Sequence, residues 1–317
     1  MKRILQDHSF QLSIILTLIF MGTGVGFLFM GLTNYSWILF VLLPIVLGIS
    51  IGAMPNGKYT FWGAVFAAVI FLMAMYIPGL SGLLCIIMTL PILIPLIFLG
   101  YVVAHLLKKY KALKSTTNLP VLLLPLLPFM VGAPVEYFMH PHQQEIVEVR
   151  TEQVYPYTPE QVYDAIKSVD TLVAEKPFLM QFDLPIPVKC VLEKEAVGGL
   201  RTCYFKAGSM SNADFGGGTI VEKITQLEKA KLLRMDVIDY NMVGRNWIGF
   251  KEAIYYFDKV GKNSCKLTRV TTYTSELTPR FYWEPLEKLG IEQEHAYVLD
   301  NLANDLKRNY GQQKGRE

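Results

Sequence analysis

The distribution of charged residues divides the chain into two parts. Two stretches of 49 residues each, Ser9–Gly57 and Tyr59–Leu107, contain no Asp, Glu, Lys or Arg. A membrane-spanning helix needs about 20 apolar residues, so each stretch has room for two helices and a turn. Turn-forming residues at Thr33–Ser36 and Pro78–Gly79 separate the helices in each stretch. The first part therefore predicts four spanning helices, over Phe10–Leu32, Trp37–Met54, Thr60–Ile77 and Leu80–Leu107.

A fifth uncharged segment, 118–135, leaves the number of spanning helices open. It is rich in leucine but contains four prolines. If this segment spans, five helices cross the membrane and the rest of the chain lies on the side opposite to the N-terminus. If it is re-entrant or lies on the membrane surface, both lie on the same side. The lysines that precede it and Glu136, which follows it, favour a spanning segment.

Basic residues around the apolar stretches predict the orientation in the membrane. They fall on one side of a four-helix layout, whereas the turns at Asn34 and Pro78 carry none. Because basic residues collect in cytoplasmic loops, we expect the N-terminus in the cytoplasm and, with a fifth span, the C-terminal part outside it. Met1-Lys2-Arg3 is also how a signal peptide begins, but the apolar run is too long and lacks a cleavage site. The basic residues that set the orientation are Lys2, Arg3, Lys58 and the cluster Lys108–Lys114.

Two pairs of glycines, each separated by three residues, mark close contacts between helices. They are Gly22 with Gly26 and Gly48 with Gly52. Small residues at this spacing either form a helix-dimer face or pack helices of one chain together, and we expect packing between the first two helices. The four predicted helices contain no Asp, Glu, Lys or Arg, which argues against an ion pump or channel.

Charge separates the two parts as clearly as hydropathy does. The chain is 52% hydrophobic and only 18% charged, and residues 1–134 carry seven basic residues and one acid. Residues 135–317 carry 23 basic and 26 acidic residues, which are interspersed, so we expect no nucleic-acid partner. Neither a plain soluble enzyme nor a disordered chain fits this division. It predicts a transmembrane region over 1–135, a linker over 136–144, a globular domain over 145–312 and a tail over 313–317.

Alternating apolar and polar residues after residue 144 predict a mostly antiparallel sheet. Turn sequences rich in Gly and Asn separate the alternating runs, so hairpins join most of the strands. After the first strand, Thr158 and Pro159 have the residue types that cap and open a short helix. The seven expected strands are Glu145–Tyr155, Val188–Ala196, Arg201–Ala207, Thr219–Leu227, Leu232–Tyr240, Phe250–Lys259 and Ser264–Ser275.

The chain ends with an amphipathic helix. Thr278 is expected to cap it and Pro279 to open it, and Pro285 and Gly290 to bend it. This helix gives the C-terminal part an α+β character. Its apolar face is expected to pack against the sheet and consists of Ile291, His295, Val298, Leu299, Leu302 and Leu306.

The order of these elements resembles the START-like, or SRPBCC, superfamily over Glu145 to about Tyr310. Within it, the chain is most similar to the polyketide cyclase/dehydrase and lipid-transport branch, in its membrane-anchored bacterial form. The resemblance implies a helix-grip fold, in which a curved antiparallel sheet wraps the long C-terminal helix. The segments that carry the resemblance are Tyr157–Tyr163, Arg201–Phe205, Thr219–Ile224, Lys266–Val270 and Pro279–Trp283.

The resemblance also implies a cavity between sheet and helix. We expect this cavity to bind a lipid or another hydrophobic small molecule next to the membrane. Fold alone does not fix the function, so two alternatives stay open. One is an enzyme of the cyclase, dehydratase or hydrolase type that uses His295 and Glu222 as acid and base. The other is a sensory or interaction protein that contacts a partner protein and has a collapsed cavity.

Eight residues are candidate ligand contacts in such a cavity. His295 lies on the apolar face of the last helix, where a satisfied core histidine is the alternative role. Arg201 is suited to an anionic head group and Glu222 alternates with apolar neighbours, although a solvent-facing position on a strand is the simpler interpretation of both. For the aromatic candidates, core packing is the alternative role. The eight are Arg201, Phe205, Glu222, Trp247, Tyr273, Tyr282, Trp283 and His295.

The sequence predicts neither a cofactor nor a metal site. Glu292 and His295 have the spacing of a metal-ligand pair, but no second pair accompanies them. The sequence contains no nucleophile elbow and no phosphate-binding loop. The cysteines form no CxxC motif, so we expect small buried side chains and leave a disulfide open. They are Cys85, Cys190, Cys203 and Cys265.

Overall fold

The chain forms two compact units in a computed structural model that describes residues 7–55, 57–139, 144–211 and 215–311. Lys2, Arg3 and the predicted tail 313–317 lie outside the described residues. The first unit comprises the described residues of Met1–Ser81, Cys85–Gln143 and Glu276–Trp283. The second comprises those of Gly82–Leu84, Gln144–Ser275 and Glu284–Glu317. The predicted domain bounds, 1–135 and 145–312, stay predictions.

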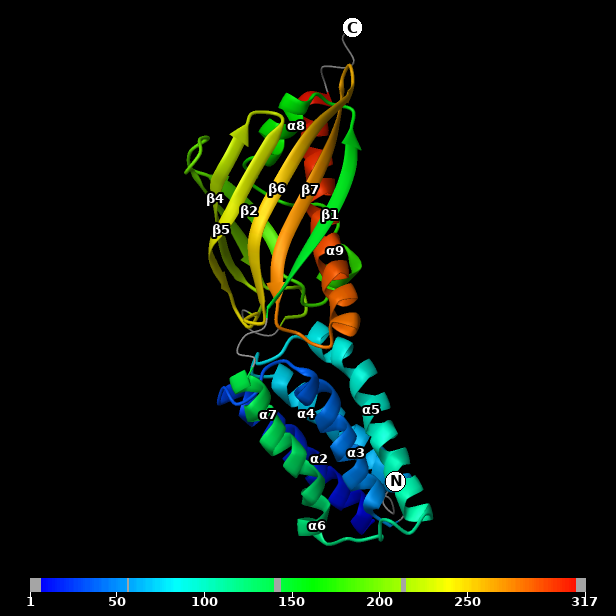
Figure 1. Ribbon diagram of the computed structural model, residues 1–317. Coiled ribbons are helices and arrows are strands. Elements are labelled where there is room, and N and C mark those ends of the chain that lie inside the picture. The colour runs from blue at the N-terminus through cyan, green and yellow to red at the C-terminus, as the bar shows by residue number, and fades with distance from the viewer. Residues whose placement is uncertain (1–6, 56, 140–143, 212–214, 312–317) are drawn as a thin grey trace. The chain divides into compact units, whose positions relative to one another are not determined.

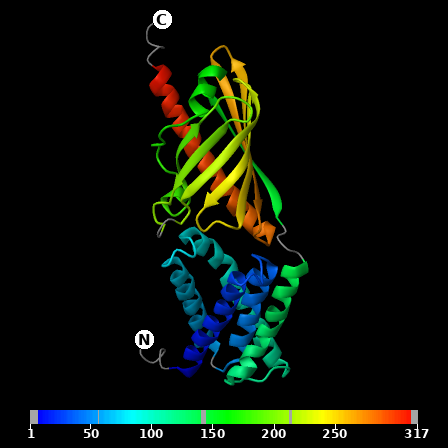
Figure 2. The same ribbon diagram turned by 90° about the vertical axis from the view of Figure 1, so that its left-hand side faces the viewer.

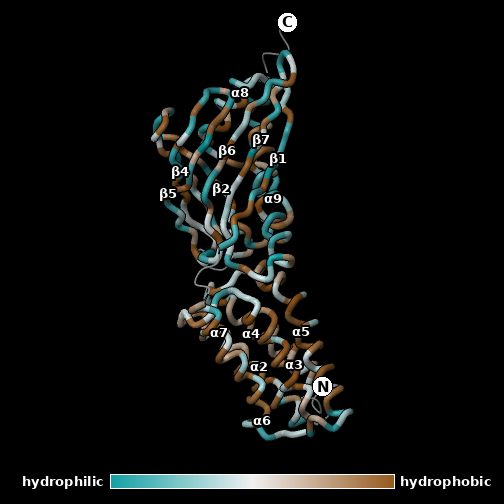
Figure 3. The backbone as a smooth tube through the Cα atoms, in the orientation of Figure 1, coloured by the Kyte–Doolittle hydropathy of each residue, from teal (hydrophilic) through white to brown (hydrophobic). Residues whose placement is uncertain are grey.

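The first unit is helical, and its helices are apolar along their length (Figures 1 and 3). Four helical segments are long and apolar enough to cross a membrane, namely His8–Phe29, Tyr59–Tyr76, Leu83–Lys109 and Leu119–Met139, and Ile38–Ala53 is shorter. The prediction of a multi-pass membrane protein is thereby confirmed. The elements are α2 (His8–Phe29), η1 (Ile38–Leu42), α3 (Leu43–Ala53), α4 (Gly57–Tyr76), α5 (Leu83–Lys109), α6 (Leu119–Leu123), η2 (Leu124–Leu126) and α7 (Leu127–Met139).

The proline-rich segment runs the length of the helical unit. At its start, the amide of Thr116 donates to the carbonyl oxygen of Ala53, at the end of α3, over 3.2 Å. At its far end, the Ser36 hydroxyl, just before η1, donates to the Glu136 carboxylate of α7. Leu122 and Phe129 lie between these two ends in the same apolar core as α3. The segment from α6 to α7 therefore passes alongside η1 and α3 from one end of the unit to the other.

Close glycine packing joins α3 to α5. A Cβ atom at Gly48 would lie 2.1 Å from the carbonyl oxygen of Ile97, and one at Gly52 would lie 2.8 Å from that of Tyr101. A Cβ atom at Gly22 or Gly26 would meet no described heavy atom within 4 Å. The expected packing between the first two helices is thus wrong for these glycines, because α5 supplies the partner of α3.

Gly48→Ala is expected to destabilise the helical unit. The added methyl group has to displace the α5 backbone, and overpacking of this kind costs about 1–3 kcal/mol. Gly26→Ala is the matched control, since the space around Gly26 is open. Thermal unfolding of the full chain in detergent micelles measures both. Equal unfolding temperatures for the two variants would contradict the α3–α5 contact.

The second unit contains a seven-stranded antiparallel sheet with the order β1-β7-β6-β5-β4-β3-β2. From β2 to β7, strands that are consecutive in the chain are neighbours in the sheet, which is what hairpin connections produce. β1 forms one edge of the sheet and pairs with β7 over its whole length, from Glu145 opposite Ser275 to Tyr155 opposite Cys265. The strands are β1 (Glu145–Tyr155), β2 (Ile186–Leu192), β3 (Leu200–Lys206), β4 (Gly218–Glu228), β5 (Leu232–Met242), β6 (Ile248–Gly261) and β7 (Ser264–Ser275).

The long terminal helix, α9 (Arg280–Tyr310), lies across the inner face of the curled sheet (Figure 2). The short helix α8 (Pro159–Ile166) and the 3-10 turn η3 (Phe178–Gln181) lie between β1 and β2 in the chain. Thr158 caps α8 through a capping box with Gln161, as the sequence predicts. The expected α+β architecture of a curved sheet around a C-terminal helix is confirmed.

Three apolar clusters hold α9 on the sheet, and one of them joins Tyr297 to Ile186 of β2. The largest one joins the C-terminal half of α9 to α8 and to the inner faces of β1, β4, β5, β6 and β7. The remaining one joins Ile291 to Val147, Val149 and Tyr273. The helix residues in the largest cluster are Val298, Leu299, Leu302 and Leu306, each less than a tenth exposed. The predicted apolar face of the helix is therefore the face that the sheet covers.

Several element bounds differ from the prediction, and two of these differences have a local cause. β2 ends at Leu192 and not at Ala196, because the chain turns there toward Gly198, which has a φ of 88°. α9 begins at Arg280, so Thr278 does not occupy the expected cap position, and the Pro279 carbonyl accepts the amides of Tyr282 and Trp283. Pro285 lies inside α9, which continues as one helix to Tyr310.

Candidate functional site

Polar side chains line the inner face of β7 and pair with α9. Residues two apart on a strand share a face, so Arg269, Thr271, Tyr273 and Ser275 all point toward the helix. Ser275 and Tyr273 donate to the Glu287 carboxylate over 2.6 and 3.1 Å. Both hydroxyls and the carboxylate are buried. These hydrogen bonds fix the position of α9 along β7 in the interior of an otherwise apolar domain.

His295 is enclosed between two strands. Its Nδ1 lies 2.8 Å from the Thr151 hydroxyl of β1, and its Nε2 lies 2.8 Å from the Thr271 hydroxyl of β7. The side chain is 0% exposed. Burial, and then the positive charge of Arg269, hold the pKa of His295 well below its ordinary value of 6.5. A neutral imidazole with both nitrogens hydrogen-bonded has the features of a satisfied core histidine.

Protonation of His295 is expected to set the stability of the domain at mildly acidic pH. The folded-state pKa is depressed, so the unfolded chain binds a proton that the folded chain does not. The contribution of His295 is fully present above pH 6.5 and is lost as pH falls below it, at up to about 1.4 kcal/mol per pH unit. His295→Gln should lack this slope in urea unfolding measured at a series of pH values. Parallel stability curves for the two proteins would contradict the assignment.

Arg201 and Glu222 form a buried ion pair on neighbouring strands. The Arg201 Nε donates to a Glu222 carboxylate oxygen over 2.7 Å, and Nη2 donates to the Tyr255 hydroxyl over 3.3 Å. Arg201 is 4% exposed and Glu222 is 6% exposed. The simpler interpretation of these two candidate ligand contacts, a solvent-facing position, is wrong. Their strands pair so that Arg201 lies directly opposite Glu222 on the inner face.

Arg269 adds a second buried guanidinium on the other side of Tyr255. Arg269 of β7 is directly opposite Tyr255 of β6 in the sheet register. Its Nη2 lies 2.9 Å from a carboxylate oxygen of Glu294 on α9. Burial opposes the charge of Arg269, but the Glu294 carboxylate and the Tyr255 hydroxyl outweigh this, so the pKa lies above its ordinary value. The interior therefore holds two charged arginines near one tyrosine ring.

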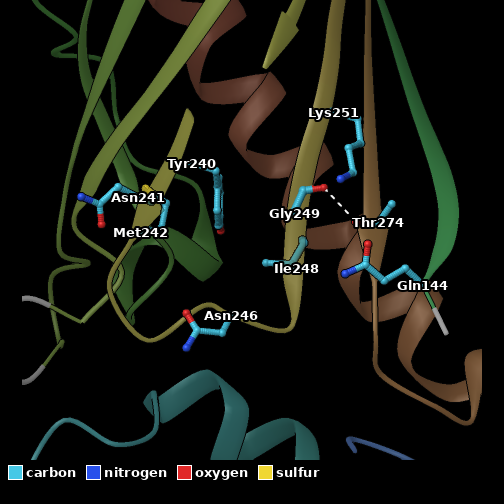
Figure 4. A pocket seen from close by; sticks show the side chains of 9 residues that line it. All are labelled: Gln144, Tyr240, Asn241, Met242, Asn246, Ile248, Gly249, Lys251 and Thr274. Carbon is cyan, nitrogen blue, oxygen red and sulfur yellow. Dashed lines mark hydrogen bonds between the residues drawn. The ribbon is translucent and has the colours of Figure 1, made fainter. Parts of the chain in front are cut away.

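A pocket of about 310 Å³ lies where β5 and β6 separate (Figure 4). The two strands pair from Leu232 opposite Tyr256 to Asp236 opposite Glu252. Beyond this point β5 pairs with β4, and β6 pairs with β7. The rings of Tyr240 and Phe250 lie 5.8 Å apart near this separation. The lining residues are Gln144, Tyr240, Asn241, Met242, Asn246, Ile248, Gly249, Lys251 and Thr274. The sheet is thus open at one place beside its inner face.

The predicted ligand contacts fall into three groups. The structure brings Arg201, Glu222, Tyr273 and His295 into the buried interior. Phe205 and Trp247 are half-buried, and neither belongs to the interior hydrogen-bond network described above. Tyr282 and Trp283 belong to the first unit, where Tyr282 donates to the carbonyl oxygen of Met88 and Trp283 packs on Phe40 at 4.9 Å.

Sequence reasoning missed several polar residues of the interior, among them Tyr255, Arg269 and Glu287. On β7 both faces are largely buried, so alternation gives no sign of which side chains point inward. One signal was available, because Arg269, Thr271, Tyr273 and Ser275 form an unbroken polar row at every second position. Such a row beside a predicted amphipathic helix indicates paired polar groups in the interior.

Two cysteines form a disulfide and a third is an unreactive buried thiol. Cys190 of β2 and Cys203 of β3 are directly opposite in register and are joined by a disulfide. Burial raises the pKa of the Cys265 thiol to about 11. Within the described residues, no group of three or more His, Cys, Asp or Glu is arranged to hold a metal ion.

No family model matches the chain, and no curated protein is similar to it in sequence. Solved structures similar to the C-terminal half include the Zhui aromatase/cyclase from Streptomyces, at 12% identity and a TM-score of 0.36 over 52% of this chain and 95% of that one. Norcoclaurine synthase from Thalictrum flavum is similar at 11% identity and a TM-score of 0.33, over 52% and 89% of the two chains. A protein of unknown function from Staphylococcus aureus is similar at 13% identity and a TM-score of 0.37, over 52% and 96%.

The architecture of the second unit is established by its own elements. Seven antiparallel strands in the order β1-β7-β6-β5-β4-β3-β2 curl around a helix that ends the chain. A helix with a capping box follows the first strand, as the resemblance implies. The C-terminal half of this chain therefore has a helix-grip fold, as expected from the sequence.

Proposed function

We propose that the protein is a membrane-anchored binding protein that takes up a hydrophobic molecule between the sheet and α9. The observation that carries this proposal is the composition of the interior between the sheet and α9. Apolar clusters lie toward both ends of the buried part of α9, and buried polar groups from β3, β4, β6 and β7 lie between the clusters. An apolar interior with a few fixed polar groups is typical of sites for hydrophobic ligands.

The pocket between β5 and β6 offers a route to this interior. Its lining includes Tyr240 and Ile248, and Tyr240 lies beside Phe250, whose ring is 6.2 Å from that of the buried Tyr273. Displacing Phe250 would connect the pocket to the inner face of β7. Because β5 and β6 share no further register pairs beyond Asp236 and Glu252, this displacement breaks no pairing between the two strands.

Uptake of a fluorescent fatty acid by the full chain in detergent tests the proposal. We expect binding of one molecule per chain. Asn246→Trp, which fills the pocket from an exposed position, should slow uptake several-fold, and Asn263→Trp at the exposed β6–β7 turn is the matched control. No saturable binding would show that the interior is collapsed and would favour a sensory or interaction role. Equal slowing by both variants would rule out this route.

Two independent features support a location of the second unit outside the cytoplasm. A disulfide such as Cys190–Cys203 persists in oxidising compartments and is rare in the cytoplasm. The segment from α6 to α7 runs the length of the helical unit, which makes five passes together with the shorter helix Ile38–Ala53. An odd number of passes places the two ends of the membrane region on opposite sides. The lysines before α6 then lie in the cytoplasm.

Reporter fusions to the full chain measure this sidedness. Alkaline phosphatase, which is active only outside the cytoplasm, should be active when fused after Glu317 and inactive when inserted at Ser115. We further expect the second unit to keep an oxidised cysteine pair when thiols are blocked before lysis, and Cys190→Ser to abolish it. The reverse pattern of reporter activity would place the domain in the cytoplasm.

A further inference from the structure

We propose that the interior site recognises the carboxylate of a hydrophobic acid through the guanidinium groups of Arg201 and Arg269. This inference rests on the proposed function and specifies the chemistry of its ligand. The candidate site is formed by Arg201 on β3, Tyr255 on β6 and Arg269 on β7, all on the inner face of the sheet.

The two guanidinium groups gather around one ring. The Cζ atom of Arg201 lies 5.4 Å from the centroid of the Tyr255 ring, and that of Arg269 lies 5.8 Å from it. Arg201 also donates to the hydroxyl of the same tyrosine. The neighbouring strands β6 and β7 and the more distant strand β3 therefore direct their polar atoms to one small region.

Three nitrogen atoms of these arginines are buried and have no hydrogen-bond partner among the described residues. They are Nη1 of Arg201 and both Nε and Nη1 of Arg269. Arg201 is 4% exposed and Arg269 is 9% exposed, so bulk water does not replace the missing partners. Leaving a buried donor unpaired costs free energy, and the cost is larger for a charged group. An oxygen-bearing group that bound there would recover this free energy.

The chemistry of the three unpartnered nitrogen atoms determines which functional group of a ligand can bind them. All three atoms are N–H donors, so the ligand must supply acceptor oxygens. Glu222 and Glu294 already balance the two positive charges, and a monoanion disturbs this balance less than a phosphate dianion. A guanidinium also matches a carboxylate in shape, because its parallel N–H groups meet the two oxygens. These considerations select a carboxylate.

The surroundings of the arginines require the rest of the ligand to be apolar. Ala253 and Phe257 flank Tyr255 on the inner face of β6, and Met235 on β5 and Ile224 on β4 belong to the same apolar cluster. A polar ligand body would lose its hydration without gaining partners there. A hydrocarbon chain is stabilised by the same surface. A long-chain fatty acid combines both requirements.

Competition binding on the full chain in a non-ionic detergent tests the inference. Radiolabelled palmitate is displaced with unlabelled palmitate, methyl palmitate and hexadecyl phosphate. The ester retains the hydrocarbon chain but lacks the anionic group, and the phosphate supplies a different anion. We expect palmitate to bind about 10- to 100-fold more tightly than the ester, the range for charge-assisted hydrogen bonds. Tighter binding of the phosphate would overturn the choice of a carboxylate.

Variants locate the effect at the two arginines. Arg201→Met combined with Glu222→Leu removes one buried pair without leaving an unpaired charge, and Arg269→Met combined with Glu294→Gln removes the other. Each should reduce the preference for palmitate over its ester about tenfold or more. Arg234→Met with Glu252→Gln removes a pair whose arginine side chain is 47% exposed and should leave the preference unchanged.

The ratio of palmitate to ester affinity separates recognition from folding. A variant that merely loosens the domain weakens both ligands alike and leaves the ratio as it was. If both ligands bind equally and the arginine variants change nothing, the carboxylate site is wrong while the proposed function stands. If neither ligand binds to the unaltered chain, the proposed function itself fails.

Discussion

Glu222→Ala is expected to destabilise the C-terminal domain by about 3–5 kcal/mol. The substitution leaves the Arg201 guanidinium buried without its carboxylate, and a charge in that position has no access to water. The remaining partner of Arg201, the Tyr255 hydroxyl, lies 3.3 Å away and carries no charge. Urea unfolding of the full chain in detergent, followed by circular dichroism of the sheet, measures the change.

The matching double variant separates the cost of an unpaired charge from the contribution of the pair. Arg201→Met with Glu222→Leu replaces both partners with apolar groups and is expected to be nearly neutral or even stabilising. Glu252→Ala is the control, because it breaks the Arg234–Glu252 pair at the edge of solvent, and exposed pairs contribute about 0–1 kcal/mol. Equal losses for Glu222→Ala and Glu252→Ala would show that the Arg201–Glu222 pair is not buried.

Leu302→Ala is expected to cost about 2–5 kcal/mol, since it deletes the centre of the contact between α9 and the sheet. Leu302 is 2% exposed and belongs to the large cluster with Tyr163, Tyr255 and Phe257. Truncation leaves a cavity that the curved sheet cannot close, because its strands are fixed by hydrogen bonds on both sides. Thermal unfolding of the full chain in detergent reports the effect.

Leu289→Ala is the matched control on the same helix. Leu289 is 42% exposed, so its truncation should change stability by less than about 0.5 kcal/mol. Both variants replace Leu with Ala on the same helix, so the change in helix propensity is the same. The two variants therefore differ in how deeply the removed side chain is buried. Similar unfolding temperatures for the two would mean that the sheet does not cover the face of α9 that carries Leu302.

The sequence predicts the elements of this fold well because each has a strong local signal. The two uncharged stretches of 49 residues allow little but membrane helices, and partial alternation of apolar and polar residues marks strands such as Glu145–Tyr155. Thr158, Pro159 and Gln161 specify the start of α8 within a few residues. These signals depend on neighbours in the chain and need no knowledge of the tertiary structure.

The interior site could be predicted only in part, because it depends on pairing between distant strands. Glu222 lies between Ile220 and Ile224 on one face of β4, which is a sign of an inward position. Its partner Arg201 follows only from the β3–β4 register, and the long connection between Lys206 and Gly218 conceals that register. Tyr255 and Arg269 face each other through the β6–β7 register, which contains two irregularities. Local patterns do not encode such offsets.

The sequence does not show to which of the two units Tyr282 and Trp283 belong. Tyr282 and Trp283 follow the sheet in the chain and were expected beside the ligand, yet they belong to the helical unit. Their contacts are Met88 and Phe40, which lie nearly 200 and more than 200 positions earlier in the chain. An amphipathic pattern shows that a residue is buried but not which surface buries it.

Photo-crosslinking tests most directly whether the helix-grip domain is where a hydrophobic molecule binds. The full chain in lipid nanodiscs is irradiated with palmitate that carries a diazirine at the end of its hydrocarbon chain, and the labelled peptides are mapped with and without excess palmitate. We expect labels that palmitate competes away on peptides from β4 to β7 and from α9. Competed labels found only on α2 to α7 would place the binding site in the membrane region and rule out binding in the helix-grip domain.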